Sequence, residues 1–220
     1  MKHDNLLWPC KLPYAAKAAL LDAAQLHTLD MDDYLVLGKG NMNGLFYVMR
    51  GIVIAGIPNL AKSTPFVLFK AGEWFGGTVI YNGADFQYRI TSVEASRIVF
   101  IPGHAIRDAA ENHRELFRLL YLVTSERARA TLEMLFVSSG MTLTQKVAYF
   151  LLEVAKRFPR VAGATPMISM SQTMLAQMLG LSRLSLNRQL HLLAEKNIIA
   201  IERKKVFIVD VPLLESLSVS

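Results

Sequence analysis

Two arginines five residues apart, Arg183 and Arg188, are the residues of this sequence whose types and spacing best fit a defined chemistry. They lie in the segment SQTMLAQMLGLSRLSLNRQLHLL, residues 171–193, which predicts two short amphipathic helices joined by a turn at 179–181. The residues that would face outward on the second helix are Arg183, Ser185, Asn187, Arg188 and His191. Side chains of these types can bond base edges and phosphates in the major groove of DNA. The segment therefore predicts a DNA-binding surface.

Other residues around this segment must hold the two helices in place. The apolar positions that can pack them together are Leu175, Met178, Leu181, Leu186, Leu190 and Leu193. Ser182 is placed to cap the second helix. The following sequence IIAIERKKVFIVDV predicts two short strands around a basic turn, and a helix-turn-helix followed by such a hairpin is a winged helix. Arg203, Lys204 and Lys205 at the tip could meet the sugar-phosphate backbone, although an ordinary solvated turn explains them equally well.

The charge of the chain is unevenly distributed. Its 220 residues are 52% hydrophobic and 19% charged, as in a folded globular protein, and the net charge is +6. Residues 141–220 hold 10 Lys and Arg against 5 Asp and Glu, whereas residues 1–140 hold 14 against 13. A net charge of +5 in the last third suits a module that binds a polyanion, attached to a nearly neutral domain.

Cys10 is the single cysteine, so one chain can form neither an internal disulfide nor an iron–sulfur cluster held by several of its own cysteines. The N-terminus has no long apolar run, and no window of about 18 uninterrupted apolar residues appears anywhere. We therefore expect no secretory signal, no membrane span and a cytoplasmic location.

The first half of the chain predicts a mainly β domain. Residues 14–26, YAAKAALLDAAQL, are rich in alanine and leucine and predict a helix. From His27 to Pro102 short apolar runs alternate with turn residues: YLVLG, LFYVMRGIVIAGI, PFVLF, TVIY, YRITSV and RIVFI. Strands this short, with turns at this spacing, indicate an antiparallel barrel or sandwich, and thus an α+β chain overall.

A long helix is expected next, because apolar residues recur in alternating steps of four and three, which is the pattern of a coiled-coil seam. The seam positions are Leu116, Leu120, Val123, Arg127, Ala130, Met134 and Val137. The opposite flank is also apolar, with Leu119, Leu122, Leu132 and Phe136. We expect this helix to join two copies of the chain, with a core helix of a monomer as the alternative.

The segment Ser138-Ser139-Gly140 should end that helix, and Thr142 or Thr144 can cap a further one that runs to about Phe158. The predicted domains are an effector-type β-roll at 1–113, a dimerisation helix at 114–139 and a winged-helix DNA-binding domain at 140–220.

This order of parts resembles the Crp/Fnr transcription regulators over nearly the whole chain. GLFYVMRGIVIAG (44–56) and FKAGEWFGG (69–77) are similar to motifs of the family's cyclic-nucleotide-binding-like β-roll. MLAQMLGLSRLSLNRQLHLLAEKNII (174–199) follows the family's DNA-binding pattern, and it is the more specific match because it fixes both arginines. The resemblance implies a homodimeric, non-enzymatic regulator that binds a palindromic double-stranded DNA site, with RNA polymerase as a further partner of any activator.

The resemblance also assigns the DNA contacts. Arg183 and Arg188 match the base-contacting arginines, and arginine can form two hydrogen bonds with guanine O6 and N7. Many members have a glutamate after the first arginine, where this chain has Leu184, which cannot accept from a cytosine amino group but could touch a thymine methyl. The DNA half-site should therefore differ from that of the family members that carry the glutamate. The implied DNA-binding set is Ser182, Arg183, Leu184, Ser185, Asn187, Arg188, Lys204 and Lys205.

The effector pocket departs further from the family. Where cyclic-nucleotide binders have Gly-Glu, this chain has Gly76-Gly77, and Arg89 is followed by Ile90 rather than by the expected serine or threonine. A buried ribose hydroxyl without its carboxylate partner would weaken binding by roughly 1–3 kcal/mol, so cyclic AMP is disfavoured. An anionic ligand held by Arg89 stays open. The corresponding pocket residues are Gly76, Gly77, Arg89, Thr91 and Thr131.

Other functions stay open at this stage. The alternatives are a sensor of haem, nitric oxide or another small ligand, a regulator without an effector, and a β-barrel enzyme of the cupin type. Haem would need axial ligands from Met, Cys10 or the five histidines, which form no distinctive group: His3, His27, His104, His113 and His191. A cupin metal site needs a cluster of histidines and carboxylates, and the β region contains only His27. A cyclic-nucleotide module without DNA binding would leave the winged helix unexplained.

Overall fold

The computed structural model describes residues 6–37, 43–56, 67–81, 88–159 and 162–219. The chain divides into two compact units, and the division within its C-terminal half lies between Glu133 and Met134. This point falls inside a long helix, six residues before the predicted start of the DNA-binding domain. The domain boundaries at 113/114 and 139/140 stay predictions. Each unit is described by itself below.

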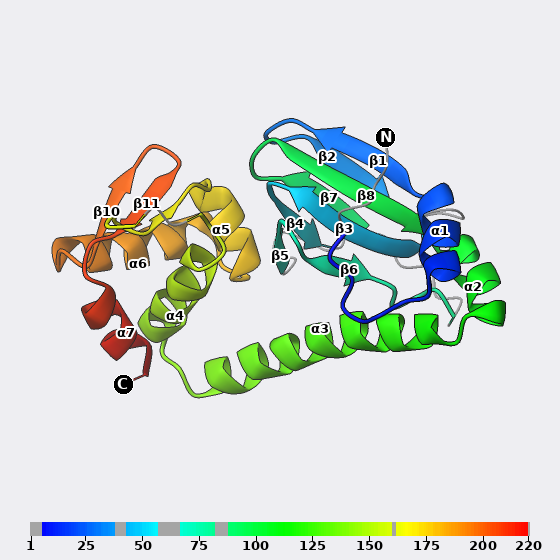
Figure 1. The fold of residues 1–220 in the computed structure, drawn as a ribbon. Helices are drawn as coiled ribbons and strands as arrows, with labels where there is room; N and C mark the ends of the chain where they lie inside the picture. Colours follow the sequence, from blue (N-terminus) through cyan, green and yellow to red (C-terminus); the bar gives the residue numbers. More distant parts are fainter. Residues whose placement is uncertain (1–5, 38–42, 57–66, 82–87, 160–161, 220) are drawn as a thin grey trace. The chain divides into compact units, whose positions relative to one another are not determined.

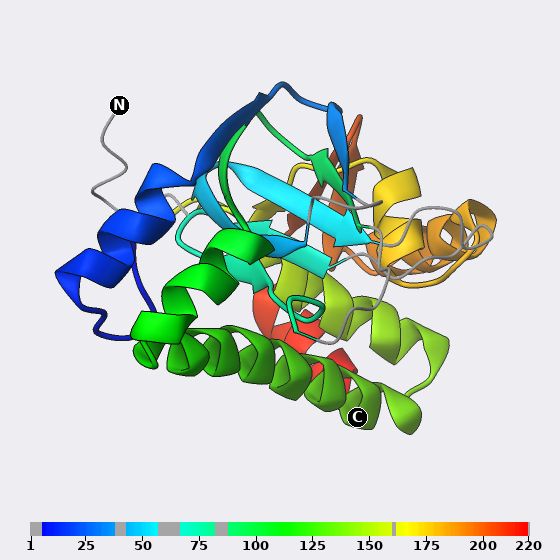
Figure 2. The same ribbon diagram turned by 90° about the vertical axis from the view of Figure 1, so that its right-hand side faces the viewer.

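The first unit contains two four-stranded sheets, and the strand pairs between which the register is defined are antiparallel. One sheet has the order β1 (Gln25–Leu29), β8 (Ser96–Pro102), β3 (Gly44–Arg50), β6 (Trp74–Gly76). The other has the order β2 (Tyr34–Leu37), β7 (Tyr88–Ser92), β4 (Ile52–Gly56), β5 (Val67–Lys70). Figures 1 and 2 show these strands together with the helices of the unit. The antiparallel barrel or sandwich predicted from the short apolar runs is confirmed.

Aromatic rings fill the space between the two sheets. Phe46 of β3 stacks on Phe100 of β8 and on Phe75 of β6, with ring centroids 4.8 and 5.0 Å apart. Phe75 in turn stacks at 4.2 Å on Phe69, which belongs to β5 of the other sheet. Phe46, Phe75 and Phe100 occupy paired positions in neighbouring strands. Because side chains alternate along a strand, these three rings lie on the same face of their sheet.

The opposite face of the β1–β8–β3–β6 sheet is covered by helices. Leu45, Tyr47, Val99 and Ile101 of this face belong to one buried cluster with residues of α1 (Tyr14–Asp22), α2 (Gly103–Asn112) and α3 (Glu115–Ser139). Figures 1 and 2 show α1 and α2 side by side at one end of the sheets. The sheet is thus apolar on both faces, which explains why β3 and β8 read as continuous apolar runs.

Two local predictions in this unit are wrong. The helix expected at 14–26 ends at Asp22, and Gln25 and Leu26 instead pair with Phe100 and Val99 as the start of β1. Cross-strand pairing therefore overrides the helix propensity of the alanine-rich segment. The run TVIY at 78–81 forms a turn, with Val79 and Ile80 buried there. It follows Gly76 and Gly77, whose φ angles of +91° and +82° end the strand.

The long helix α3 confirms the expected element, but its predicted seam does not face outward along its whole length. Leu116, Leu120 and Val123 are buried in the core cluster of their own unit. The guanidinium of Arg127 lies 4.4 Å from the centroid of the Phe69 ring, so the charge that interrupts the seam also faces the β-roll. Ala130 is half-buried, and the side chains of Met134 and Val137 lie outside the described set. The first half of the predicted seam is therefore not available to a partner helix.

The second unit begins with the end of α3 and contains α4 (Leu143–Ala155), β9 (Met167–Ile168), α5 (Gln172–Met178), α6 (Arg183–Glu195), β10 (Ile199–Glu202), β11 (Lys205–Ile208) and α7 (Val211–Val219). Thr142 caps α4 with Gln145 in a reciprocal capping box. The winged helix is confirmed, and two elements are added to it. Strand β9 makes the hairpin a three-stranded sheet of order β10-β11-β9, and α7 packs against α4 (Figure 1). No helix among the described residues is long and apolar enough to span a membrane.

Candidate nucleic-acid interface

The turn between α5 and α6 is held by backbone bonds and two serine caps. Ser171 Oγ accepts from Met174 N at 3.2 Å at the start of α5, and Ser182 Oγ accepts from Ser185 N at 3.0 Å at the start of α6. Between them, Gly180 has a φ of +66°, which glycine adopts without strain. The Gly180 and Leu181 amides bond to the carbonyls of Gln177 and Ala176 at 3.1 and 2.9 Å. This Schellman arrangement ends α5 and directs the chain into α6.

The inner faces of α5 and α6 form the core beneath the turn. Leu175, Met178, Leu186, Leu190 and Leu193 are buried, as their spacing predicts, whereas Leu181 is half-buried. Leu186, Leu190 and Leu193 are at most 1% exposed. Burial of this stripe leaves the opposite side of α6 to solvent.

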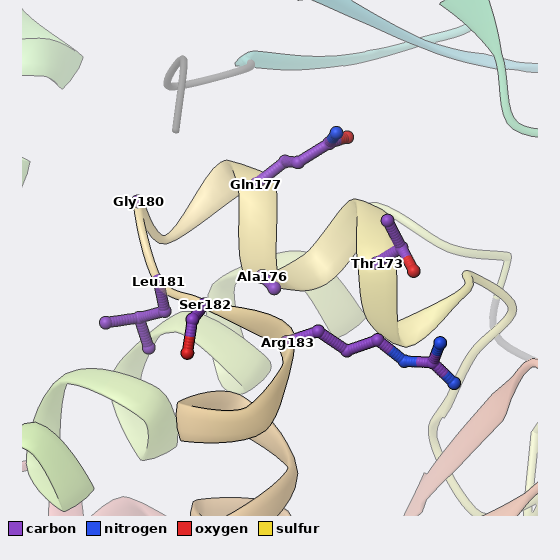
Figure 3. Close-up of a pocket in the computed structure, with 7 residues that line it drawn as sticks. All are labelled: Thr173, Ala176, Gln177, Gly180, Leu181, Ser182 and Arg183. Atoms are coloured by element: carbon purple, nitrogen blue, oxygen red, sulfur yellow. The ribbon is translucent and has the colours of Figure 1, made fainter. Parts of the chain in front are cut away.

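The exposed side of α6 carries both predicted base-contacting residues. Arg183 and Arg188 are exposed, and neither forms an ion pair with any other residue that the structure describes. Leu184 between them is 62% exposed, and His191 is also exposed one turn further along. A shallow hollow of about 400 Å³ lies where α5 and α6 meet. Figure 3 shows the Arg183 side chain running past the start of α5 near Thr173, while Gln177 points away from it.

Two hydrogen bonds that sequence reasoning missed attach the flanks of α6 to its neighbours. Asn187 Nδ2 donates to Gln172 Oε1 at 3.1 Å, which joins α6 to the first residue of α5. Thr144 Oγ1 donates to Gln189 Oε1 at 2.7 Å, which joins α6 to α4. The sequence did offer one sign of the first bond, because Asn187 is a polar residue on the side of α6 that faces α5. Asn187, predicted to be free for DNA, is instead partly committed to a bond within the protein.

The serines of the predicted set are also bonded to each other. Ser182 Oγ lies 2.8 Å from Ser185 Oγ, and it accepts from the Ser185 amide as the cap of α6. Ser182 is exposed and Ser185 is half-buried. Their first role is therefore to fix the N-terminus of the helix, whose partial positive charge favours a nearby phosphate.

The tip of the wing is basic and exposed. Arg203, Lys204 and Lys205 are all exposed. In the register of the β10–β11 hairpin, Lys205 lies opposite Glu202. Lys204 has a φ of +59°, in the left-handed region that non-glycine residues rarely adopt. The turn thus presents basic side chains from a tight two-residue connection.

The predicted effector residues come from the end of β6, from β7 and from α3. Gly76 and Gly77 end β6, and a Cβ on Gly77 would lie 3.1 Å from Leu45 Cδ2 and 3.4 Å from Leu120 Cδ2. Arg89 of β7 is half-buried, and its guanidinium stacks 4.1 Å from the centroid of the exposed Tyr34 ring. Thr91 is buried on the same strand as Arg89. Thr131 is exposed on α3 and donates to the Arg127 carbonyl at 2.9 Å.

The candidate metal ligands do not form a cluster in the described part of the chain. No three His, Cys, Asp or Glu side chains there come together as a metal-binding group. His27 lies on the inner face of β1 near Phe100, and its buried Nε2 has no hydrogen-bond partner among the residues that the structure describes. Removal from water disfavours the charged imidazolium, which lowers the pKa of His27 below 6.5. His3 lies outside the described residues.

The comparisons with known proteins point to one family. Residues 145–217 match the family model of the Crp-like helix-turn-helix domain. No curated protein matches the sequence of the chain. A solved structure from Eubacterium rectale, described as a Crp/Fnr-family transcriptional regulator, has a TM-score of 0.79 and 18% identity, covering 95% of this chain and 96% of that one.

Two further solved structures are similar. The Crp/Fnr-family regulator TTHA1359 of Thermus thermophilus has a TM-score of 0.74 and 17% identity, covering 89% of this chain and 99% of that one. FixK2 of Bradyrhizobium japonicum has a TM-score of 0.72 and 19% identity, covering 90% and 98%. Residues 145–217 therefore belong to the Crp-like helix-turn-helix domains, and the chain as a whole has the fold of the Crp/Fnr transcription regulators.

Proposed function

We propose that the protein is a homodimeric, sequence-specific DNA-binding transcription regulator that acts in the cytoplasm. The observation that carries this proposal is the exposed pair Arg183 and Arg188 on α6, a helix whose other side is buried in a winged helix. Each subunit places α6 in a major groove, where the two guanidinium groups contact base edges. The exposed Arg203, Lys204 and Lys205 of the wing contact the sugar-phosphate backbone beside it.

The dimer forms along α3, on a stripe that differs from the one expected at first. The apolar residues that remain exposed on this helix include Phe117, Tyr121 and Leu132, at 49, 67 and 52%. They fall within an arc about 60° wide at 100° per residue. The midpoint of the buried pair Leu116 and Leu120 lies about 110° from the centre of this arc. Two-fold symmetry then gives an inverted-repeat site with half-sites about 34 Å apart.

The β-roll serves as a control domain for an effector other than cyclic AMP, or acts without one. The carboxylate that would take a ribose hydroxyl is absent at Gly77, where a side chain would crowd Leu45 and Leu120. The Arg89 guanidinium stacks on the exposed Tyr34 ring, and a phosphate held by Arg89 would compete with this contact. Aromatic rings and the Arg127 guanidinium occupy the space beside Phe69 instead.

The experiment that tests the function is selection of duplexes from random DNA by the full-length protein, followed by titration of the selected site. We expect the selected site to be an inverted repeat. The logarithm of the binding constant should fall linearly with the logarithm of the salt concentration, because phosphate contacts release counterions. Binding of selected and random duplexes with equal affinity would reject the proposal.

Arg183→Ala identifies the surface that binds. We expect a loss of roughly 1–3 kcal/mol in binding free energy on the selected site and relaxed preference at one base pair of each half-site. Lys156→Ala is the matched control, since Lys156 belongs to the same unit, and its ammonium pairs with Glu153 on α4. It should leave both affinity and sequence preference unchanged.

A further inference from the structure

Four residues, 184–187, separate the two exposed arginines of α6, and their polar side chains are bonded within the protein. Ser185 Oγ lies 2.8 Å from the Oγ of Ser182, which caps the helix. Asn187 Nδ2 donates to Gln172 Oε1 at 3.1 Å on the side of α6 that faces α5. Ser185 and Asn187 are also both half-buried. A hydrogen bond from either residue to a base edge would compete with a bond that already exists.

The apolar residues of the same turn differ sharply in exposure. Leu186 is fully buried in the core, whereas Leu184 is 62% exposed. Leu184 directly follows Arg183 and lies four residues before Arg188, so these three side chains share the N-terminal part of α6. The side chain between the arginines that is most open to a DNA groove is therefore a hydrocarbon.

The chemistry of the major groove limits what a leucine can recognise there. Base edges in this groove offer hydrogen-bond donors, acceptors and one apolar group, the 5-methyl of thymine. A leucine gains nothing from the donors and acceptors, and it gains burial of apolar area only against the methyl. We propose that Leu184 recognises the 5-methyl group of a pyrimidine between the two arginine contacts of each half-site. This inference rests on the proposed function.

A methyl contact differs from a hydrogen-bond contact in what it tolerates. The 5-methyl group projects into the major groove from thymine and from 5-methylcytosine alike, whereas deoxyuridine and cytosine lack it. Recognition by Leu184 therefore follows the methyl group rather than the identity of the base pair. Burial of one such group corresponds to about fourfold in affinity per half-site.

The test uses the full-length protein and the site selected from random DNA. Each thymine is replaced in turn by deoxyuridine, symmetrically in both half-sites, and binding is measured by fluorescence anisotropy. We expect one position per half-site where deoxyuridine weakens binding by about fourfold per half-site. At that position, a duplex with cytosine should bind more weakly than one with 5-methylcytosine.

Two variants assign the effect to Leu184. Leu184→Ala should bind thymine and deoxyuridine duplexes equally, and Leu184→Glu should prefer cytosine, whose N4 amino group donates to a carboxylate. The matched control is Leu192→Ala, since Leu192 is 45% exposed two turns further along α6. It should keep the dependence on the methyl group. Circular dichroism establishes that each variant is folded.

Equal affinity of the wild-type protein for thymine and deoxyuridine at every position would overturn the inference. So would a methyl dependence that Leu184→Ala retains. Both results leave sequence-specific binding intact, whereas failure of the proposed function would appear earlier, as a selection that enriches no site.

Discussion

Asn187 of α6 donates a hydrogen bond of 3.1 Å from its side-chain amide to that of Gln172, the first residue of α5. On the other flank of α6, Thr144 bonds to Gln189 at 2.7 Å. Together with the buried leucine stripe, these two bonds constrain rotation of α6 about its own axis, and so they help to set which way Arg183 and Arg188 point. Asn187 is thereby partly withdrawn from the proposed DNA-binding surface.

Removing the Asn187–Gln172 bond should destabilise the second unit. We expect Asn187→Ala and Gln172→Ala each to lower the free energy of unfolding by about 0.5–1.5 kcal/mol, measured by urea denaturation. The double variant should lose less than the sum of the two, because the second substitution has no bond left to remove. Gln177→Ala is the control, since its side chain points away from the α5–α6 contact in Figure 3. Strictly additive losses would contradict the coupling.

A side chain at Gly77 should destabilise the β-roll and should not create a cyclic-nucleotide site. Its φ of +82° costs a non-glycine residue about 1–2 kcal/mol, and a Cβ would lie 3.1 Å from Leu45 Cδ2. We therefore expect Gly77→Ala to lower the melting temperature. Gly140→Ala is the control, because a Cβ there meets nothing within 4 Å. Cyclic AMP binding by a folded Gly77→Glu variant, detected by calorimetry, would show that the glycine alone disables the pocket.

His27 should make the stability of the protein depend on pH. Its pKa is lowered in the folded state by burial, so below about pH 6.5 the unfolded chain binds more protons than the folded one. Stability should thus be full above that pH and decrease as pH falls through 6.5 toward the lower folded-state pKa. Urea denaturation at pH 7.5 and 5.5 measures this decrease.

His27→Phe should weaken that pH dependence, because a phenyl ring beside Phe100 carries no proton. His104→Gln should leave the pH dependence as it is, since His104 is exposed at the start of α2. An unchanged pH dependence in His27→Phe would assign the effect to another group.

The helix-turn-helix was predictable from local sequence, because a cap, a turn glycine and an apolar stripe each have their own signal. The same signals placed Arg183 and Arg188 outward. The orientation of α3 was not predictable in this way, since Leu116 and Phe117 are both apolar neighbours and only the position of the sheet decides which one is buried. The contacts of Asn187 and Arg89 were not predictable either, because their partners, Gln172 and Tyr34, are distant along the chain.

The proposed dimer contact on α3 can be tested by introducing a charge into it. Tyr121 is 67% exposed on this helix, so Tyr121→Glu should leave the fold intact while placing a carboxylate, together with its symmetry copy, in the apolar dimer contact. We expect a monomer by analytical ultracentrifugation and loss of binding to the full inverted repeat.

The control for this prediction is Tyr14→Glu on α1, where Tyr14 is 88% exposed. It should remain dimeric, because α1 is not part of the proposed contact. Leu120→Ala should instead lower the free energy of unfolding by about 2–5 kcal/mol, as expected for a leucine buried in the core of its own subunit. If Leu120→Ala dissociated a fully stable dimer while Tyr121→Glu did not, the dimer contact would lie on the seam first expected from the sequence.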